Sequence, residues 1–287
     1  MARRKPPTVH GVTVVDKPAG VTSHDVVGML RRRFDERRVG HAGTLDPDAT
    51  GVLVVAVGNA TRLLRFVEKT RKGYTGEIVL GSSTSTLDAS GTVLATFDMS
   101  AVTIEAARRA VAEHLIGAIE QVPPMVSAIR VEGKRLHELA RQGVEVEREP
   151  RQVTVDRFDL EWVEPGVLRA EIECSAGTYV RSLADDLGRL LGGGAHLRQL
   201  RRTHVGDFSL AEAAPPDDCV LQPVERTVRA LARVEVDEPT AALVANGRVL
   251  DAWRGDGPWA VFDPSGRLLA VYEPFRGSAK PSVVLPA

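Results

Sequence analysis

Residues 40–51 read GHAGTLDPDATG, and the six residues that follow, 52–57, read VLVVAV. The first stretch is bounded by glycines and carries His41, Asp46 and Asp48. Because Asp46 precedes a proline, its backbone is pushed away from the helical region into an extended or turn conformation. The second stretch is a continuous apolar run, which is typical of a buried strand. The sequence therefore predicts a rigid loop that presents carboxylates at the start of a buried strand.

The residues of this loop allow two interpretations. The Asp-Pro-Asp sequence at 46–48 is typical of a simple turn in which the aspartates accept backbone hydrogen bonds. Two carboxylates this close together also suggest acid and nucleophile chemistry of the glycosidase type, although no second glutamate motif supports that chemistry. The sequence of the loop alone is compatible with a structural role and with a chemical role of the two aspartates.

Strands and helices are interleaved irregularly around the loop. Apolar periodicity predicts strands at 11–16, 52–57, 74–80, 126–131, 152–161, 167–174 and 199–208. It predicts helices at 24–34, 60–70, 103–115, 134–141 and 179–191. Thr22 or Ser23 is suited to cap the first helix, and Thr178 the last. Because regular βαβ alternation is absent, we expect an α+β fold with a mixed, largely antiparallel sheet.

The character of the chain changes near residues 215–218, which read PPDD. After Arg233 the chain contains short β-like runs separated by turns, at 249–253, 259–262 and 268–272. We therefore expect two domains, a catalytic domain at 1–230 and a small β-rich domain at 231–287.

Composition narrows the class of protein. The 287 residues carry a net charge of −1, and 43% of them are hydrophobic and 26% charged, as in an ordinary globular protein. No apolar run approaches the roughly 20 residues that span a bilayer, so we expect no membrane contact and a cytoplasmic location. Cys174 and Cys219 are far apart and lack a CxxC partner. We expect buried reduced thiols and no metal site.

Basic residues form clusters despite the small net charge. The clusters are Arg3-Arg4-Lys5, Arg31-Arg32-Arg33 with Arg37-Arg38, and Arg198 with Arg201-Arg202. A cluster of this kind is more often a solvated surface than a phosphate contact. The charge distribution therefore permits an RNA partner without requiring one.

A second group of polar residues lies between a predicted strand and a predicted helix, where residues 174–181 read CSAGTYVR. A cap at Thr178 places Tyr179 and Arg181 in the first helical turn, a position suited to face a site. Arg181 always carries its charge and can hold a buried carboxylate ionised and oriented. A salt bridge from Arg181 to Asp185 is an equally good interpretation.

Together these segments resemble the TruB-type tRNA pseudouridine synthases. Residues 40–53 fit the signature of that family, which is close to GHxGTLDPxAxGxL. Further family motifs follow in the family's order, at Lys17-Pro-x-Gly20 with Thr22-Ser23, Lys72-Gly-Tyr74, residues 81–91 around Asp88, Pro123 to Ala128, Ala140 to Gly143, Gly177 to Arg181 and Gly194 to Arg198. The resemblance covers residues 11–205. The C-terminal part is similar to the family's PUA-like module in position and β-rich character only.

The resemblance implies a pseudouridine synthase fold and conversion of uridine 55 in the T-loop of tRNA to pseudouridine. It implies Asp46 as the nucleophile, with Tyr74 and Arg181 as further catalytic residues. It also implies substrate contacts from His41, Asp88, Tyr179 and Leu200. This chemistry needs no cofactor, and the sequence has no Walker loop, dinucleotide fingerprint or metal-spaced ligands.

The expected partner is the T-arm stem-loop of tRNA, whose target base has to leave the folded loop and enter a pocket. We expect a monomer that uses neither a metal nor a nucleotide cofactor. Two alternatives stay open, a non-catalytic RNA-binding or RNA-folding factor and a pseudouridine synthase that acts on another RNA. The intact Asp46 loop argues against the first, and the lack of long basic extensions argues against the second.

Overall fold

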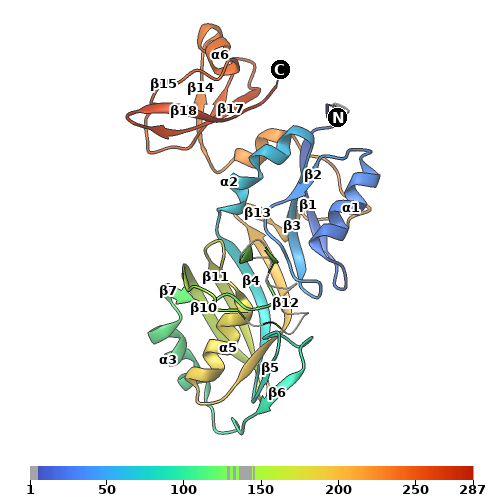
Figure 1. Ribbon diagram of the computed structural model, residues 1–287, viewed down its shortest axis with the longest axis vertical. Coiled ribbons are helices and arrows are strands. Elements are labelled where there is room, and N and C mark those ends of the chain that lie inside the picture. The colour runs from blue at the N-terminus through green and yellow to red at the C-terminus, as the bar shows by residue number, and fades with distance from the viewer. Residues whose placement is uncertain (1–5, 128–129, 132–133, 136–143, 145, 287) are drawn as a thin grey trace. The chain divides into compact units, whose positions relative to one another are not determined.

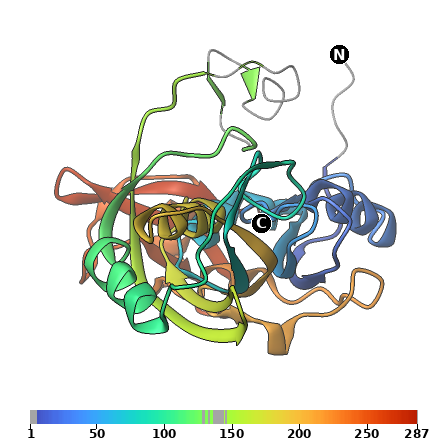
Figure 2. The same ribbon diagram turned by 90° about the horizontal axis from the view of Figure 1, so that it is seen from below.

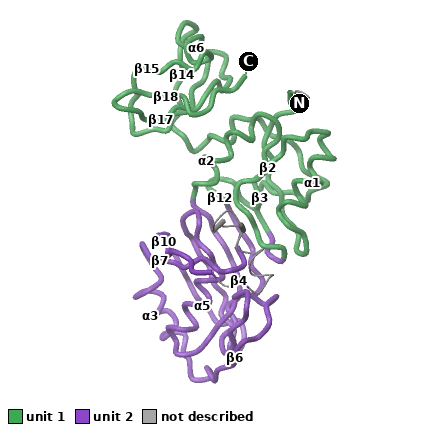
Figure 3. Tube along the Cα trace, viewed as in Figure 1, with its two compact units in different colours: residues 1–47, 51–70, 205–287 green, residues 48–50, 71–204 purple. Residues whose placement is uncertain are grey.

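The computed structural model describes residues 6–127, 130–131, 134–135, 144 and 146–286 (Figure 1). The chain divides into two compact units (Figure 3). Unit 1 comprises residues 1–47, 51–70 and 205–287, and unit 2 comprises residues 48–50 and 71–204. This division differs from the domain boundary predicted after residue 230, which stays a prediction.

Unit 1 is built around β3 (Thr50–Val57), which pairs in antiparallel fashion with β1 (Gly11–Lys17) and β2 (Val39–His41). Residues 52, 54 and 56 of β3 pack in one buried cluster, and residues 53, 55 and 57 pack in another. The strand is thus buried on both faces. This explains why its sequence is a continuous apolar run rather than an alternating one.

Helix α1 (Ser23–Arg33) covers one face of this sheet with a buried apolar stripe. Its N-cap is Thr22, whose hydroxyl accepts a hydrogen bond from Asp25 N while the Asp25 carboxylate accepts one from Thr22 N. This reciprocal arrangement is a capping box. The hydrogen bonds from Thr22 lower the pKa of the Asp25 carboxyl. The predicted helix is therefore confirmed, with Thr22 as its cap.

The rest of unit 1 departs from the prediction in its details. The single helix predicted at 60–70 consists of a 3-10 segment, η1 (Gly58–Leu63), followed by α2 (Leu64–Glu68). Short elements connect this part to the C-terminal region, namely β13 (Phe208–Ser209), η2 (Leu210–Glu212) and η3 (Val224–Val228).

The C-terminal region forms a five-stranded sheet in the order β14 (Ala232–Glu235), β16 (Trp259–Phe262), β17 (Leu268–Phe275), β18 (Ser278–Val284) and β15 (Leu250–Asp251). Strands β14 and β16 are parallel, and the other pairs are antiparallel. The sequence predicted a β-rich region but missed β14, β18 and the helix α6 (Glu238–Ala245).

Unit 2 contains a sheet with the strand order β12 (Ala195–Val205), β4 (Lys72–Leu80), β11 (Val167–Cys174), β10 (Arg151–Glu164) and β7 (Gly117–Gln121). The pairs from β4 to β7 are antiparallel. Helices α3 (Ile104–His114) and α5 (Val180–Leu190) pack against each other, and α3 packs beside β10 (Figure 2). The expected α+β fold with a largely antiparallel sheet is confirmed.

Two small hairpins complete unit 2. One pairs β5 (Ser82–Thr84) with β6 (Val93–Thr96), and the other pairs β8 (Arg130–Val131) with β9 (Lys134–Arg135). Of the strand predicted at 126–131, residues 130–131 form β8, residues 126–127 belong to no strand, and residues 128–129 lie outside the described residues. The helix predicted at 134–141 is wrong at its start, because pairing with β8 overrides the local helical periodicity, and residues 136–143 lie outside the described residues.

Cys174 and Cys219 are both buried free thiols, as predicted. Burial raises the pKa of the Cys174 thiol to about 11, so this thiol stays protonated and inert at neutral pH. Over the described residues, no helix is long and apolar enough to cross a membrane. The same residues contain no group of three His, Cys, Asp or Glu side chains that could hold a metal ion.

Candidate active site

The loop that carries Asp46 is attached to the body of unit 1 on both sides of this residue. Before it, the Ser23 hydroxyl accepts a hydrogen bond from Leu45 N (2.9 Å) and donates one to Leu45 O (3.1 Å). After it, Lys17 Nζ donates to Pro47 O (2.8 Å). These bonds fix the backbone next to Asp46 without using its carboxylate.

Both attachment points are buried polar side chains, since Lys17 is 0% exposed and Ser23 is 1% exposed. A buried ammonium is unfavourable unless its donors are satisfied. Lys17 meets this condition because Nζ also donates to Pro18 O (2.8 Å) and Val21 O (2.6 Å). The end of β1 and the start of α1 therefore form the support of the loop.

The two aspartates of the loop lie in different environments, because Asp46 is half-buried whereas Asp48 is exposed. Electrostatic interactions are stronger where water is excluded, so Asp46 is the better placed of the two for chemistry. His41 is half-buried at the end of β2, opposite Val55 of β3. His41 thus ends β2, and Asp46 lies in the loop that follows β2 in unit 1.

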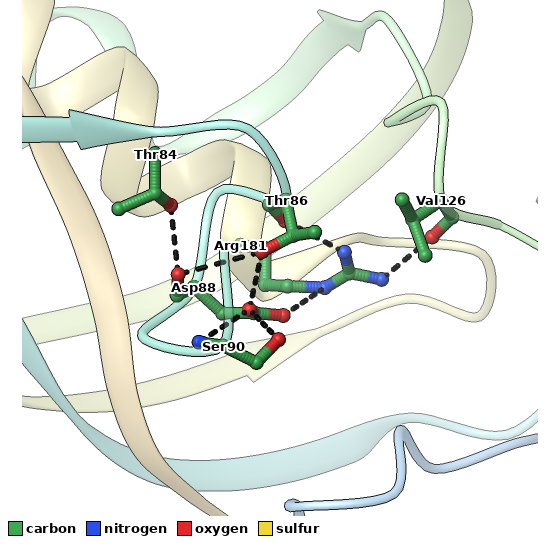
Figure 4. Close-up of polar contacts among 6 residues, drawn as sticks. All are labelled: Thr84, Thr86, Asp88, Ser90, Val126 and Arg181. Carbon is green, nitrogen blue, oxygen red and sulfur yellow. Dashed lines mark hydrogen bonds and ion pairs between the residues drawn. The ribbon is translucent and has the colours of Figure 1, made fainter. Parts of the chain in front are cut away.

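Arg181 lies in the first turn of α5 in unit 2 and is 4% exposed. Its Nη1 donates to Thr86 O (2.8 Å), its Nη2 donates to Val126 O (2.9 Å), and its Nε lies 3.6 Å from Asp88 Oδ2 (Figure 4). The alternative of a salt bridge from Arg181 to Asp185 is wrong. The partner of Asp185 is Arg189, one helical turn further on, at 2.7 Å.

Asp88 is itself held by the turn in which it lies. Its Oδ1 accepts hydrogen bonds from Thr86 Oγ1 (2.6 Å), Ser90 N (3.1 Å) and Ser90 Oγ (2.6 Å) (Figure 4). Thr84 Oγ1 donates to the backbone carbonyl of Asp88 (2.7 Å). The hydroxyl residues at 84, 86 and 90 therefore position the carboxylate that pairs with Arg181.

The start of α5 is fixed by a residue that the sequence did not indicate. Thr178 is not the N-cap, because its hydroxyl donates to Ser175 O (3.0 Å) and Tyr179 occupies the cap position. Gln121 of β7 holds Tyr179 instead, since its Oε1 accepts from Tyr179 N (2.7 Å) and its Nε2 donates to Tyr179 O (3.0 Å). This buried amide therefore sets where the helix that carries Arg181 begins.

The side chains of Tyr74, in β4, and Leu200, in β12, lie on the same side of β4. Tyr74 is 9% exposed and pairs with Ile172 of β11. Gly76, two residues further along β4, faces the same side of the sheet as Tyr74. A Cβ atom at Gly76 would lie 3.4 Å from Leu200 Cδ1, so Leu200 of β12 packs over this side of the strand.

Two residues with strained backbone precede predicted site residues in unit 2. Leu87 has a φ of 61° and comes before Asp88, and Gln199 has a φ of 54° and comes before Leu200. Residues other than glycine rarely adopt this left-handed region, because it costs them about 1–2 kcal/mol. Residues with such strained backbone cluster at functional sites. Neither Leu87 nor Gln199 is a residue type from which the sequence would predict a positive φ.

Family models match most of the chain. Residues 31–180 match "TruB family pseudouridylate synthase (N terminal domain)", residues 181–219 match "tRNA pseudouridylate synthase B C-terminal domain", and residues 231–286 match "tRNA Pseudouridine synthase II, C terminal". The chain belongs to the TruB family of pseudouridine synthases.

Relatives of this TruB-family chain point to the same activity. The tRNA pseudouridine synthase B of Mycobacterium tuberculosis is 47% identical over 274 residues, which cover 91% of both chains. The tRNA pseudouridine synthase B of an Arthrobacter species is 45% identical over 294 residues, which cover 96% of both chains. The TruB-family chain is therefore a tRNA pseudouridine synthase, an isomerase that makes pseudouridine in tRNA.

Solved structures show the same fold as this TruB-family chain. A chain in the crystal structure of a Cbf5-Nop10-Gar1 complex superposes with a TM-score of 0.74 at 24% identity, covering 96% of this chain and 85% of that chain. A chain in the structure of an H/ACA RNP bound to a substrate RNA superposes with a TM-score of 0.70 at 23% identity, with coverage of 96% and 85%. At this identity the likeness shows the fold alone.

Proposed function

We propose that this enzyme isomerises the uridine at position 55 in the T-loop of tRNA and that Asp46 is the nucleophile. The observation that carries the proposal is the attachment of Leu45 and Pro47 by the buried side chains of Ser23 and Lys17. A carboxylate is a competent nucleophile when its position is fixed before the substrate arrives. The exposed Asp48 lacks the half-buried setting of Asp46.

The reaction balances without a redox partner or an energy source. The bond between N1 of uracil and C1′ of the ribose breaks, and a bond between C5 and C1′ forms. C5 loses a proton and N1 gains one, so the nucleotide keeps its composition. Asp46 forms one covalent bond, to C6 of the base or to C1′ of the sugar, and this bond breaks again when the product forms.

In this proposal Arg181 provides the positive charge for the reaction. Its guanidinium is buried and cannot lose its proton, so it can orient a nearby carboxylate and stabilise negative charge that develops on the base. Asp88 holds the guanidinium at 3.6 Å, which makes Asp88 a positioning residue for Arg181. Contact between Asp88 and the substrate, which the family resemblance implies, is the second part of its proposed role.

The uridine has to be extruded from the T-loop, which costs roughly a few kcal/mol. We propose that Tyr74 stacks on the extruded base, since aromatic stacking returns about 1–3 kcal/mol per base. Leu200 packs over the same face of β4, and we propose that it lines the pocket together with Tyr179. His41 is proposed to contact the displaced loop of the tRNA.

The C-terminal region, residues 231–287, is proposed to be a separate PUA-like domain that adds RNA contacts. Its five-stranded sheet and its match to a C-terminal model of the family support this assignment. In this proposal residues 231–287 bind the same tRNA as the catalytic part, through residues other than those of the Asp46 loop.

The test uses unmodified tRNA transcribed with uridine that carries tritium at C5. We expect the wild-type enzyme to release the label of one uridine per tRNA, and sequencing to place pseudouridine at position 55. A tRNA with cytidine at position 55 should release none. Pseudouridine at another position, or formed only in another RNA, would contradict the T-loop assignment while leaving the family activity intact.

A further inference from the structure

An exposed group of arginines lies at the C-terminal end of α1 and in the turn that follows it. Arg31, Arg32 and Arg37 form this surface, which we call the α1 basic face, and all three are exposed. Within the described part of the chain, no carboxylate lies within 4 Å of any of these three guanidinium groups. The face is therefore a local concentration of positive charge without internal neutralisation.

The end of α1 brings these arginines together. Glu36 N donates to Arg31 O (3.2 Å) and Asp35 N donates to Arg32 O (3.4 Å), while Asp35 has a φ of 46°. These two bonds form a Schellman motif, in which a residue in the left-handed region ends the helix and reverses the chain. The reversal returns residue 36 to the level of residue 31, so Arg37 follows beside the last helical turn.

The nearest acidic residues leave the face positive. Glu36 is only 9% exposed, and its carboxylate accepts hydrogen bonds from Arg38 N (2.8 Å) and Thr8 N (3.2 Å). The hydrogen bond from Arg38 N is the main cause that lowers the pKa of Glu36, which keeps this inward carboxylate ionised and occupied. Asp35 is exposed and is outnumbered by the arginines.

Several other arginines differ from those of the face because they have partners within the protein. Arg33, in the same helical turn, donates from Nε to Cys219 O (2.9 Å) and belongs to the body of the unit. Arg157, Arg169 and Arg267, whose side chains are about half exposed, each form an ion pair with a nearby carboxylate. Among the described residues, Arg31, Arg32 and Arg37 have no such partner, and a polyanion is the ligand whose charge matches them.

We propose that the α1 basic face binds backbone phosphates of the tRNA substrate. Arginine suits this role because its planar guanidinium binds phosphate oxygens in a bidentate manner. Ser23, at the other end of α1, holds the Asp46 loop, and Arg31 lies eight residues further along, about 12 Å at the 1.5 Å rise per residue of an α-helix. The face therefore contacts the RNA backbone at a distance from the reacting base. The inference rests on the proposed function for the identity of the RNA.

The test measures equilibrium binding of unmodified full-length tRNA and of the isolated T-arm stem-loop over a range of salt concentrations. For the triple variant R31Q/R32Q/R37Q, we expect the Kd for full-length tRNA to rise about tenfold at ~0.1 M salt. The slope of log Kd against log salt should become shallower by about 2, because contacts between cations and phosphates are lost. The charge-retaining variant R31K/R32K/R37K should recover most of the slope.

A matched control is the variant R157Q/R169Q/R267Q, which removes the same charge from ion-paired arginines. We expect its Kd and salt slope to stay within twofold and about 0.5 of the wild-type values. Equal behaviour of the two triple variants, or a wild-type slope in R31Q/R32Q/R37Q, would overturn the proposal.

The two RNAs distinguish the source of the phosphates. A loss of affinity for both RNAs assigns the contact to the T-arm, and a loss for full-length tRNA alone assigns it to another arm, and either result supports the proposal. Because the readout is binding, it is independent of turnover. A wild-type enzyme that binds tRNA but makes no pseudouridine at position 55 would refute the proposed function and leave this test in force.

Discussion

The described attachments of the two groups of candidate catalytic residues involve different parts of the residues. In unit 1, Asp46 is positioned through the backbone on either side of it, by Ser23 and Lys17. In unit 2, Arg181 is positioned through its own guanidinium, by Asp88 and two backbone carbonyls. A change at residue 46 leaves the hydrogen bonds of Leu45 and Pro47 in place. A change at residue 181 removes the hydrogen bonds of the guanidinium itself, so it should affect both chemistry and local structure.

The largest effect is expected for Asp46→Asn. The nucleophilic carboxylate becomes an amide of the same shape, so the single-turnover rate should fall by about 10³-fold or more. The Kd for tRNA should change by less than about tenfold, because phosphate contacts supply most of the affinity. The variant should still fold, because Leu45 and Pro47 keep their attachments.

Asp48→Asn is the matched control, since it makes the same chemical change two residues away at an exposed position. Its rate should stay within about threefold of wild type, as expected for a surface substitution. Equal inactivation of the two variants would show that the assignment within the loop is wrong.

Arg181→Ala should lower the rate by about 10²-fold, the effect of removing one preorganised charge from an active site. It should also lower the free energy of unfolding, by about 3 kcal/mol, because a buried charge pair is broken and buried carbonyls lose their donor. Arg181→Lys keeps the charge without the planar fork, so its rate and stability should lie between those of the wild type and those of Arg181→Ala. Urea unfolding together with single-turnover kinetics checks both. Full stability in Arg181→Ala would contradict the contrast between the units.

Ser23→Ala should have a smaller effect, which appears in the rate. The substitution removes both hydrogen bonds to Leu45 and lets the loop shift, so kcat should fall by about tenfold with little change in KM. Thr22→Ala is the control, because it removes the cap of the same helix and should cost about 1 kcal/mol of stability without slowing the reaction. If the two substitutions slowed the enzyme equally, helix stability rather than loop position would be the cause.

The smallest effect on activity is expected for Asp185→Asn, because the partner of Asp185 is Arg189 rather than Arg181. The rate should stay within twofold. A loss comparable to that of Arg181→Ala would make Asp185 part of the site.

Asp185 should also affect stability in a pH-dependent way. Burial raises the pKa of Asp185 above its ordinary value of 3.8. Between that value and the raised one, the folded chain binds more protons than the unfolded chain, so stability falls as pH rises through this window. Asp185→Asn removes this contribution, and urea unfolding from pH 4 upward should give a shallower decline for the variant. A steeper decline would show that the carboxylate stabilises the fold at neutral pH.

Local sequence patterns predicted elements whose stability is local. The capping residue and apolar stripe of α1, the continuous run of β3 and the turn between β10 and β11 are all visible in short windows. The C-terminal elements α6 and β18 lack such signals. β18 contains Pro281 and is stabilised by pairing with β17, a contact that a short window of sequence does not contain.

The candidate site likewise contains residues with a local sequence signal and residues without one. The motif around Asp46 is contiguous and was recognised, and the pairing of Asp88 with Arg181 lies between two recognised motifs. The holding roles of Ser23 and Gln121 were not predicted, because their contacts are distant in sequence. Ser23 is 22 residues from Leu45, and Gln121 is 58 residues from Tyr179. Thr178 was predicted as the cap because local sequence could not reveal that Tyr179 occupies the cap position, held by a buried amide from another strand.

The most direct test of the central claim is a crystal structure of Asp46→Asn bound to a T-arm stem-loop with uridine at position 55. The account predicts that this uridine is extruded, with C6 or C1′ about 3–3.5 Å from the side chain of residue 46, as near-attack geometry requires. The Tyr74 ring should lie against the base and Arg181 beside residue 46. A uridine still stacked in the T-loop, or extruded to a place where residue 46 and Arg181 do not meet, would contradict the account.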